Sequence, residues 1–183
     1  MKNTVLKLAV LSFVMLGLSV QAQKKKDEKK VELSVAEKKK ALEAEKARLI
    51  KPYNPKENAE VELSKLIEKA QAENKNIIVQ AGGNWCIWCL RFNQFVQDTP
   101  ELKSFVDKHF LYYHLNWSPD NKNEALFEKY GNPGEKYGYP VFIILNKNGE
   151  MIHVQESSGF EEGKGYSVDK VKEFFEKWAE ASK

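Results

Sequence analysis

The stretch Gln80-Ala-Gly-Gly-Asn-Trp-Cys-Ile-Trp-Cys-Leu-Arg91 decides the fold of this chain of 183 residues. It holds both cysteines of the chain, Cys86 and Cys89, with two residues between them. The apolar residues 77–79 before it predict a buried strand, and the apolar residues after it favour a helix. A Cys-x-x-Cys pair at such a strand-to-helix junction indicates thiol chemistry, because the N-terminus of a helix stabilises a thiolate.

The first 22 residues have the pattern of a secretory signal peptide. Lys2 and Lys7 supply positive charge, residues 8–20 form an apolar run, and residues 20–22 offer a small-residue cleavage site. The run is short for a membrane-spanning helix, which needs about 20 residues. We therefore expect a cleaved signal peptide and a periplasmic or otherwise exported protein, with an uncleaved membrane anchor as the alternative.

Positive charge is concentrated ahead of the folded part of the chain. Residues 24–51 contain eleven Lys and Arg against six Asp and Glu, so the chain that follows is mildly acidic although the whole sequence has a net charge of +3. A domain that binds nucleic acid needs a basic face of its own. We therefore expect no nucleic-acid partner.

The charged segment is predicted to be a spacer that is partly helical or disordered. Its Ala, Glu and Lys residues favour a helix, but its apolar residues are too sparse to hold that helix against a core. A helix that docks onto a partner or an anionic membrane surface is the alternative. Pro52 and Pro55 end any helix here, and they mark the predicted domain boundary. The predicted organisation is a signal peptide over 1–22, a spacer over 23–55 and a domain over 56–183.

Helices and strands alternate in the rest of the chain. Thr99 is a good N-cap residue and Pro100 suits the first position of a helix. The predicted elements are helix 59–73, strand 77–80, a helix after the cysteines, a helix from 100, strand 110–116, helix 124–130, strand 141–145, strand 150–155 and a last helix after 167. This alternation indicates an α/β domain with parallel strands, to which the hairpin at 146–149 adds an antiparallel edge.

The two cysteines are placed for thiol–disulfide exchange. Cys86 would lie just ahead of the first helical turn, where unpaired backbone N–H groups favour a thiolate that can attack a substrate disulfide. Cys89, one turn further on and more buried, could then attack the mixed disulfide and release the reduced product. The expected substrates are disulfides of proteins or of small molecules.

Other roles for the cysteines fit the sequence less well. A Cys86–Cys89 bridge closes so short a loop that it adds little stability. A structural zinc site needs four ligands, and His109, His114 and His153 complete no recognised ligand spacing. We interpret these histidines as surface residues. Haem attachment requires a histidine directly after the second cysteine, where this chain has leucine. We expect no metal and no cofactor beyond the redox-active Cys86–Cys89 disulfide.

The chain resembles the thioredoxin superfamily over roughly residues 60–180. The resemblance rests on Trp85-Cys86-Ile87-Trp88-Cys89, on Gly138-Tyr139-Pro140-Val141-Phe142 and on a Lys-Asn-Gly hairpin. The Trp-Cys-x-Trp-Cys form is similar to exported bacterial thioredoxin-like proteins of the disulfide-reductase type. The resemblance implies a thioredoxin-like α/β fold, in which helices flank a central mixed β-sheet.

The resemblance also implies roles for particular residues. Pro140 would follow a cis peptide bond and face the dithiol, and Tyr139 would offer backbone hydrogen bonds to the substrate. Apart from the resemblance, we expect at least one of Trp85 and Trp88 to border the dithiol and present apolar surface to the substrate, with packing in the core as the alternative. Thioredoxins carry an Asp six residues before the first cysteine, where it assists proton transfer to the second. This chain has Gln80 there, which cannot ionise, so another group or water must take that proton.

The predicted function is that of an exported thiol–disulfide oxidoreductase. The residues between the cysteines, Ile87 and Trp88, include no histidine that would stabilise the thiolate of a strong oxidant, so a reducing role is favoured. A redox partner, either membrane-bound or soluble, would renew the dithiol. The alternative is a thioredoxin-like binding module without catalysis, or a structural disulfide.

Overall fold

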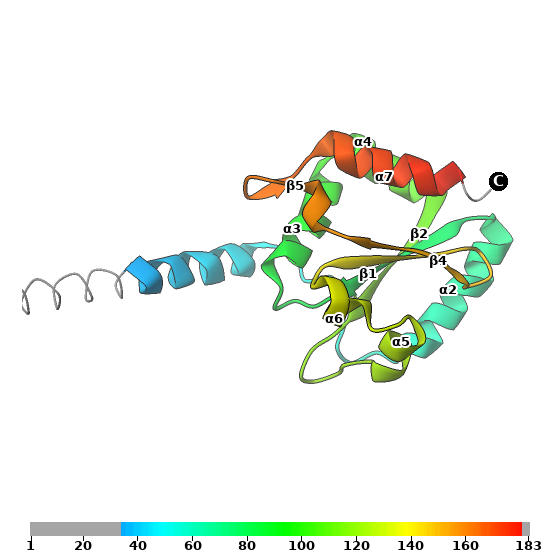
Figure 1. Ribbon diagram of the computed structural model, residues 1–183, viewed down its shortest axis with the longest axis horizontal. Helices are drawn as coiled ribbons and strands as arrows, with labels where there is room; N and C mark the ends of the chain where they lie inside the picture. Colours follow the sequence, from blue (N-terminus) through cyan, green and yellow to red (C-terminus); the bar gives the residue numbers. More distant parts are fainter. Residues whose placement is uncertain (1–33, 181–183) are drawn as a thin grey trace, which may run out of the picture. The chain divides into compact units, whose positions relative to one another are not determined.

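The computed structural model describes residues 34–180, and within them a four-stranded sheet in the order β2-β1-β3-β4 forms the centre of the domain (Figure 1). The central strand β1 (Asn76–Gly82) is buried along its whole length because helices cover both of its faces. It pairs in parallel with β2 (Phe110–Asn116) and antiparallel with β3 (Val141–Leu145). The edge strand β4 (Met151–Glu156) runs antiparallel to β3. The mixed sheet confirms the predicted fold class.

The direction of β3 corrects our prediction of parallel strands joined by helices. The chain between β2 and β3 holds only α5 (Glu124–Lys129) and α6 (Pro133–Tyr137). A helix of six residues spans about 9 Å, whereas a seven-residue strand spans about 23 Å. These helices are therefore too short to carry the chain back along the sheet. The third strand begins at the edge where β2 ends, with Val141 opposite Ala81, and runs in the reverse direction.

Two layers of helices cover the sheet (Figure 1). One face lies under α3 (Ile87–Asp98), α4 (Pro100–His109) and α7 (Val168–Glu180), and the other lies under α2 (Ala59–Glu73) with α5. The core on the α2 side is mostly aliphatic. The core on the α3 side is mostly aromatic and includes Phe92, Phe110, Phe142, Phe160, Tyr166, Phe174 and Phe175.

The starts of α2 and α4 show how far local side-chain chemistry predicts the first residue of a helix. The Asn58 side chain accepts hydrogen bonds from the first turn of α2, which begins at the predicted residue. Thr99 occupies the N-cap position of α4 as predicted, but its side chain does not cap that helix. Its hydroxyl donates instead to the carbonyl of Phe95 at 2.7 Å, at the end of the preceding helix. Thr99 is thus both the C-cap residue of α3 and the N-cap residue of α4, and its side chain bonds only to α3.

Several short elements were not predicted. They are α6, a 3-10 turn at Ser158–Phe160, and the strand pair β5 (Glu161–Glu162) and β6 (Gly165–Tyr166). The sequence here is rich in glycine and proline, and we expected loops. Tyr166 is buried among the aromatic core residues, which explains why this segment packs closely.

The charged segment ahead of the domain is helical over residues 34–48. The compact unit of the domain begins at Arg48. Tyr53, which lies on the spacer side of our boundary at 55, is therefore a buried residue of the domain core. The predicted signal peptide lies outside the described residues. Within residues 34–180 no helix combines the length and the apolar character that crossing a bilayer requires.

Candidate active site

The dithiol lies where β1 passes into α3. Cys86 is the N-cap residue of α3, and its Sγ lies 3.1 Å from the backbone N of Cys89. The two residues form a disulfide with their Cα atoms 5.2 Å apart. Cys89 is fully buried, whereas 6% of Cys86 is exposed. The N-terminus of α3 therefore stabilises negative charge on the Cys86 sulfur, and the first cysteine is the one that a substrate can reach.

The predicted Tyr139–Pro140 pair faces this dithiol. The peptide bond between these residues is cis, and the carbonyl oxygen of Tyr139 lies 3.6 Å from Cys86 Sγ. Pro140 is buried, and the side chain of Tyr139 is partly exposed. Two segments more than fifty residues apart thus meet at the sulfur of Cys86.

The two tryptophans of the motif lie in different environments. Trp85 is 48% exposed, its ring meets that of Tyr139 edge to face, and its indole N–H donates to the carbonyl of Trp117 at 2.6 Å. Trp88 packs instead against the ring of Tyr166, with the guanidinium of Arg91 4.8 Å from its ring centre. Trp85 therefore offers the exposed apolar surface beside the dithiol, and Trp88 forms part of the support behind it.

Comparison with known proteins agrees with this fold. The family model described as thioredoxin-like matches residues 58–147. The crystal structure of a disulphide isomerase from Xylella fastidiosa Temecula1 superposes with a TM-score of 0.62 at 21% identity, covering 70% of this chain and 97% of that one. Residues 58–147 of this chain form a thioredoxin-like domain.

A curated relative of this chain is the disulfide bond reductase DsbH of Chlamydia pneumoniae. It is 25% identical to this chain over 116 residues. The matched region covers 58% of this chain and 66% of the relative, so the chain spans about two thirds of that protein's length.

At the position where thioredoxins carry a buried Asp, this chain has Gln80, which lies in a hydrogen-bonded layer beneath the dithiol. The Gln80 amide nitrogen donates to the Tyr53 hydroxyl at 2.8 Å and to the carbonyl of Cys89 at 3.1 Å. Its amide oxygen accepts from the Tyr112 hydroxyl at 2.6 Å. All of these groups are neutral, and they join β1, β2 and the segment ahead of α2 to the second cysteine.

Tyr53 is the member of this layer that sequence reasoning missed. It is buried, and it packs in one cluster with Cys86 and Cys89. The side chain of Asn84 fixes its backbone by accepting from the Tyr53 N–H at 3.2 Å and donating to the Tyr53 carbonyl at 2.7 Å. The available signal was a single aromatic residue between two prolines, which local pattern cannot link to a motif thirty residues later.

Our prediction that all three histidines are surface residues is wrong for His114. Its Nε2 atom is buried and has no hydrogen-bond partner among the described residues. Its ring contacts those of Tyr53 and Tyr112, and it lines a small cavity of about 80 Å³ together with Tyr112. Burial lowers the pKa of His114 to about 4. The ring is therefore neutral at physiological pH.

The tyrosines around the dithiol are also held neutral. Burial raises the pKa of Tyr53, Tyr112 and Tyr166 well above the ordinary value of 10, and it raises the pKa of Tyr139 to about 12. A buried phenol of this kind can donate a hydrogen bond but gives up its proton only at strongly alkaline pH.

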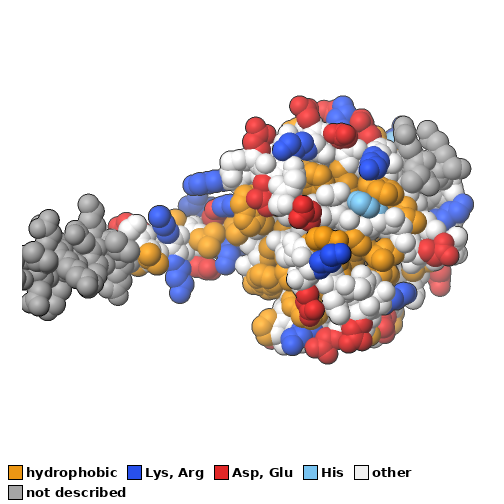
Figure 2. Space-filling view, in the orientation of Figure 1, with side chains coloured by type: hydrophobic (Ala, Val, Ile, Leu, Met, Phe, Trp, Pro, Cys, Tyr) orange, Lys and Arg blue, Asp and Glu red, His pale blue; other side chains and the backbone are white. Residues whose placement is uncertain are grey.

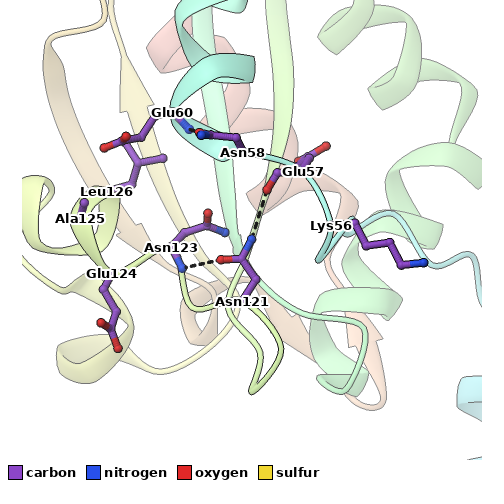
Figure 3. A pocket seen from close by; sticks show the side chains of 9 residues that line it. All are labelled: Lys56, Glu57, Asn58, Glu60, Asn121, Asn123, Glu124, Ala125 and Leu126. Atoms are coloured by element: carbon purple, nitrogen blue, oxygen red, sulfur yellow. Dashed lines mark hydrogen bonds between the residues drawn. The ribbon is translucent and has the colours of Figure 1, made fainter.

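A separate hollow of about 390 Å³ lies between the start of α2 and the loop that leads into α5 (Figure 3). None of the predicted site residues lines it. Figure 3 shows Asn121 bonded both to the carbonyl of Glu57, at 3.1 Å, and to the backbone N–H of Asn123, at 3.1 Å. The carboxylate of Glu57 also accepts from the Tyr113 hydroxyl. These bonds fix the segment ahead of α2 and so help to hold Tyr53 in place.

Charge on the surface is mixed. On the face shown in Figure 2, acidic and basic side chains are interspersed, and among the described residues drawn there basic side chains do not gather into one patch.

Proposed function

We propose that this protein is a thiol–disulfide oxidoreductase that reduces disulfides through Cys86 and Cys89. The observation that carries the proposal is the position of the Cys86 sulfur, at the N-terminus of α3 and 3.6 Å from the Tyr139 carbonyl. A structural bridge would not need this exposed aromatic rim or this opposing backbone. The relatedness to a disulfide bond reductase supports the same activity.

The proposed reaction has two exchange steps. The Cys86 thiolate attacks one sulfur of the substrate disulfide, so that a mixed disulfide forms and the other substrate sulfur leaves as a thiolate. The Cys89 thiolate then attacks the Cys86 sulfur and expels the second substrate thiolate. The dithiol loses two electrons, the substrate gains them, and the two departing thiolates take the proton of Cys89 and one from solvent.

The surface around Cys86 suits an extended substrate with an apolar side chain next to its disulfide. Trp85 and the ring of Tyr139 supply the apolar contact, and the backbone of Tyr139 lies at hydrogen-bonding reach of the reacting sulfur. Protein disulfides fit this description, and small disulfides would use the same sulfur with fewer contacts. Either a membrane-bound or a soluble partner would return electrons to the dithiol.

We further propose that the protein acts outside the cytoplasm. This part of the proposal rests on the charge and apolar pattern of residues 1–22. An oxidising compartment is also where substrate disulfides form and persist.

Reduction of insulin disulfides in the presence of dithiothreitol tests the activity. We expect the wild-type protein to accelerate precipitation of the reduced insulin chains and Cys86→Ser to lose this effect. Cys89→Ser should accumulate a mixed disulfide, because the first step remains and the second is lost. Equal rates for wild type and Cys86→Ser would contradict the proposal and favour a binding module without catalysis.

A further inference from the structure

The second step of the proposed reaction raises a chemical question. Cys89 must lose its proton to attack, yet it is fully buried. Tyr53 from the segment ahead of α2 and Cys86 pack in one cluster with Cys89, and Tyr139 from the loop before β3 packs against it. The next titratable side chains are Tyr112 of β2, which bonds to Gln80, His114 of β2, which contacts Tyr53, and Tyr166 of β6, which contacts Trp88. The tyrosines and the histidine are neutral at pH 7, so stabilisation of a Cys89 thiolate must come from hydrogen bonds.

The orientation of the Gln80 amide determines the direction of the hydrogen bonds beneath Cys89. A backbone carbonyl can only accept, so the amide atom 3.1 Å from the Cys89 carbonyl must be the nitrogen. The amide oxygen then faces Tyr112, whose hydroxyl must donate to it. The second amide hydrogen points to the Tyr53 oxygen, which accepts.

This arrangement leaves the hydroxyl hydrogen of Tyr53 unused. Its oxygen already accepts from Gln80, and within residues 34–180 the hydrogen has no acceptor in the disulfide form. The Tyr53 hydroxyl and the Cys89 sulfur both lie beside Gly82. A Cβ atom added at Gly82 would lie 2.9 Å from the Tyr53 oxygen and 2.5 Å from Cys89 Sγ. The hydroxyl and the second sulfur therefore border the same small space, which is kept open because residue 82 has no side chain.

We propose that Tyr53 donates a hydrogen bond to the Cys89 thiolate during the second exchange step, and that Gln80 and Tyr112 orient it. This inference rests on the proposed function and identifies the groups that assist Cys89 in place of a carboxylate. Hydrogen bonds that run in one direction, from Tyr112 through Gln80 to Tyr53, polarise one another and strengthen the last donor. Tyr53 keeps its own proton throughout. Cys89 gives up its proton before its thiolate attacks, to solvent or to the substrate thiolate released in the first step, and the sulfur–sulfur bond forms as described above.

Dithiobis(nitrobenzoate), an aromatic disulfide whose released thiolate is coloured, separates the two steps. Attack by Cys86 on this probe releases one coloured thiolate, and attack by Cys89 releases the second. In Tyr53→Phe the loss of a hydrogen bond to a charged acceptor lowers the fraction of Cys89 thiolate about ten- to a hundredfold. Without the hydrogen bond the Cys89 thiolate is more basic and therefore more nucleophilic, and this offsets about half of the change in the logarithm of the rate. The second release should therefore be about three- to tenfold slower at neutral pH, with the first unchanged.

The pH profile distinguishes this role from a structural one. At alkaline pH, where Cys89 is ionised in both proteins, the second release of Tyr53→Phe should equal or exceed that of the wild type. Tyr130→Phe is the matched control, because it removes a buried hydroxyl that has no hydrogen-bond partner among the described residues and lies in the core on the α2 side, and it should leave both releases unchanged. A fluorinated tyrosine at position 53 keeps the shape and strengthens the donor, so the second release should become faster.

The outcomes separate this inference from the proposed function. If the wild-type protein releases neither coloured thiolate, the proposed function fails whatever Tyr53 does. If both releases occur and the second is the same in wild type, Tyr53→Phe and the fluorinated variant at every pH, only the role of Tyr53 is overturned. Equal slowing of both releases in Tyr53→Phe would also overturn it, because a general distortion of the site would then explain the effect.

Discussion

The hydrogen bond between Gln80 and Tyr112 should be measurable as a coupling free energy. In the wild type the Tyr112 hydroxyl lies 2.6 Å from the amide oxygen of Gln80. Replacing Gln80 by Met keeps a side chain of similar length but leaves this hydroxyl without its acceptor. A buried polar group left unpaired costs about 1–3 kcal/mol, and the lost bonds to Tyr53 and Cys89 add about 1 kcal/mol. We expect Gln80→Met to lower the free energy of unfolding by about 2–4 kcal/mol and Tyr112→Phe by about 1–3 kcal/mol.

The double variant decides whether this reasoning holds. With both partners apolar, neither leaves the other unpaired, so the combined loss should fall short of the sum of the single losses by about 1–2 kcal/mol. Urea unfolding of the oxidised proteins at pH 7 measures this, provided that the dependence on denaturant is the same in all four proteins. Single effects that add to within about 0.5 kcal/mol would show that the two groups do not interact.

Three further changes test other parts of the site. Gly82→Ala should destabilise the protein by about 1–3 kcal/mol and slow the second exchange step, because the new methyl group would overlap Cys89 Sγ. Gly159→Ala is the control: there is open space around Gly159, so this change should alter stability by less than about 0.5 kcal/mol. Burial lowers the pKa of His114 from its ordinary 6.5 to about 4, so the folded protein loses stability as the pH falls from about 6.5 towards 4. Between pH 7 and pH 5, the free energy of unfolding measured in urea should fall by about 2 kcal/mol more for the wild type than for His114→Leu. Trp85→Ala should lower kcat/KM for insulin about fivefold or more while the reaction with dithiobis(nitrobenzoate) stays near the wild-type rate, and equal losses for both substrates would argue against a contact with the polypeptide.

Much of the fold follows from local pattern. The apolar run at Val141–Leu145 and the helical spacing over Ala59–Glu73 predicted β3 and α2 at their observed bounds. The order of elements, however, does not specify strand direction. That direction depends on how far the helices between β2 and β3 carry the chain, and the predicted helix 124–130 is itself too short to return the chain along the sheet. The length of the helices in a connection, more than their presence, decided the topology here.

The residues of the candidate site were likewise predictable from the sequence only in part. Cys86 and Cys89 are visible in the sequence because their spacing alone carries the chemistry, and Tyr139–Pro140 because it accompanies them in a family pattern. The groups beneath the dithiol are ordinary residues whose role arises from contact. Tyr53 and Gln80 lie twenty-seven positions apart and are joined by one hydrogen bond. No spacing rule for a helix or strand relates two such positions, so only the tertiary structure brings them together.

A neutral polar layer gives this dithiol a different dependence on pH from a site that contains a buried carboxylate. A carboxylate near a thiol changes charge as it binds or loses a proton, so the two groups titrate together. Around Cys89, His114 is uncharged above about pH 4 and Tyr139 is uncharged up to about pH 12. Over the range between, the charge next to the second sulfur changes only when the cysteines themselves ionise. The rate of the second exchange step should therefore follow one ionisation, and the strength of the Tyr53 donor sets the pH at which it occurs.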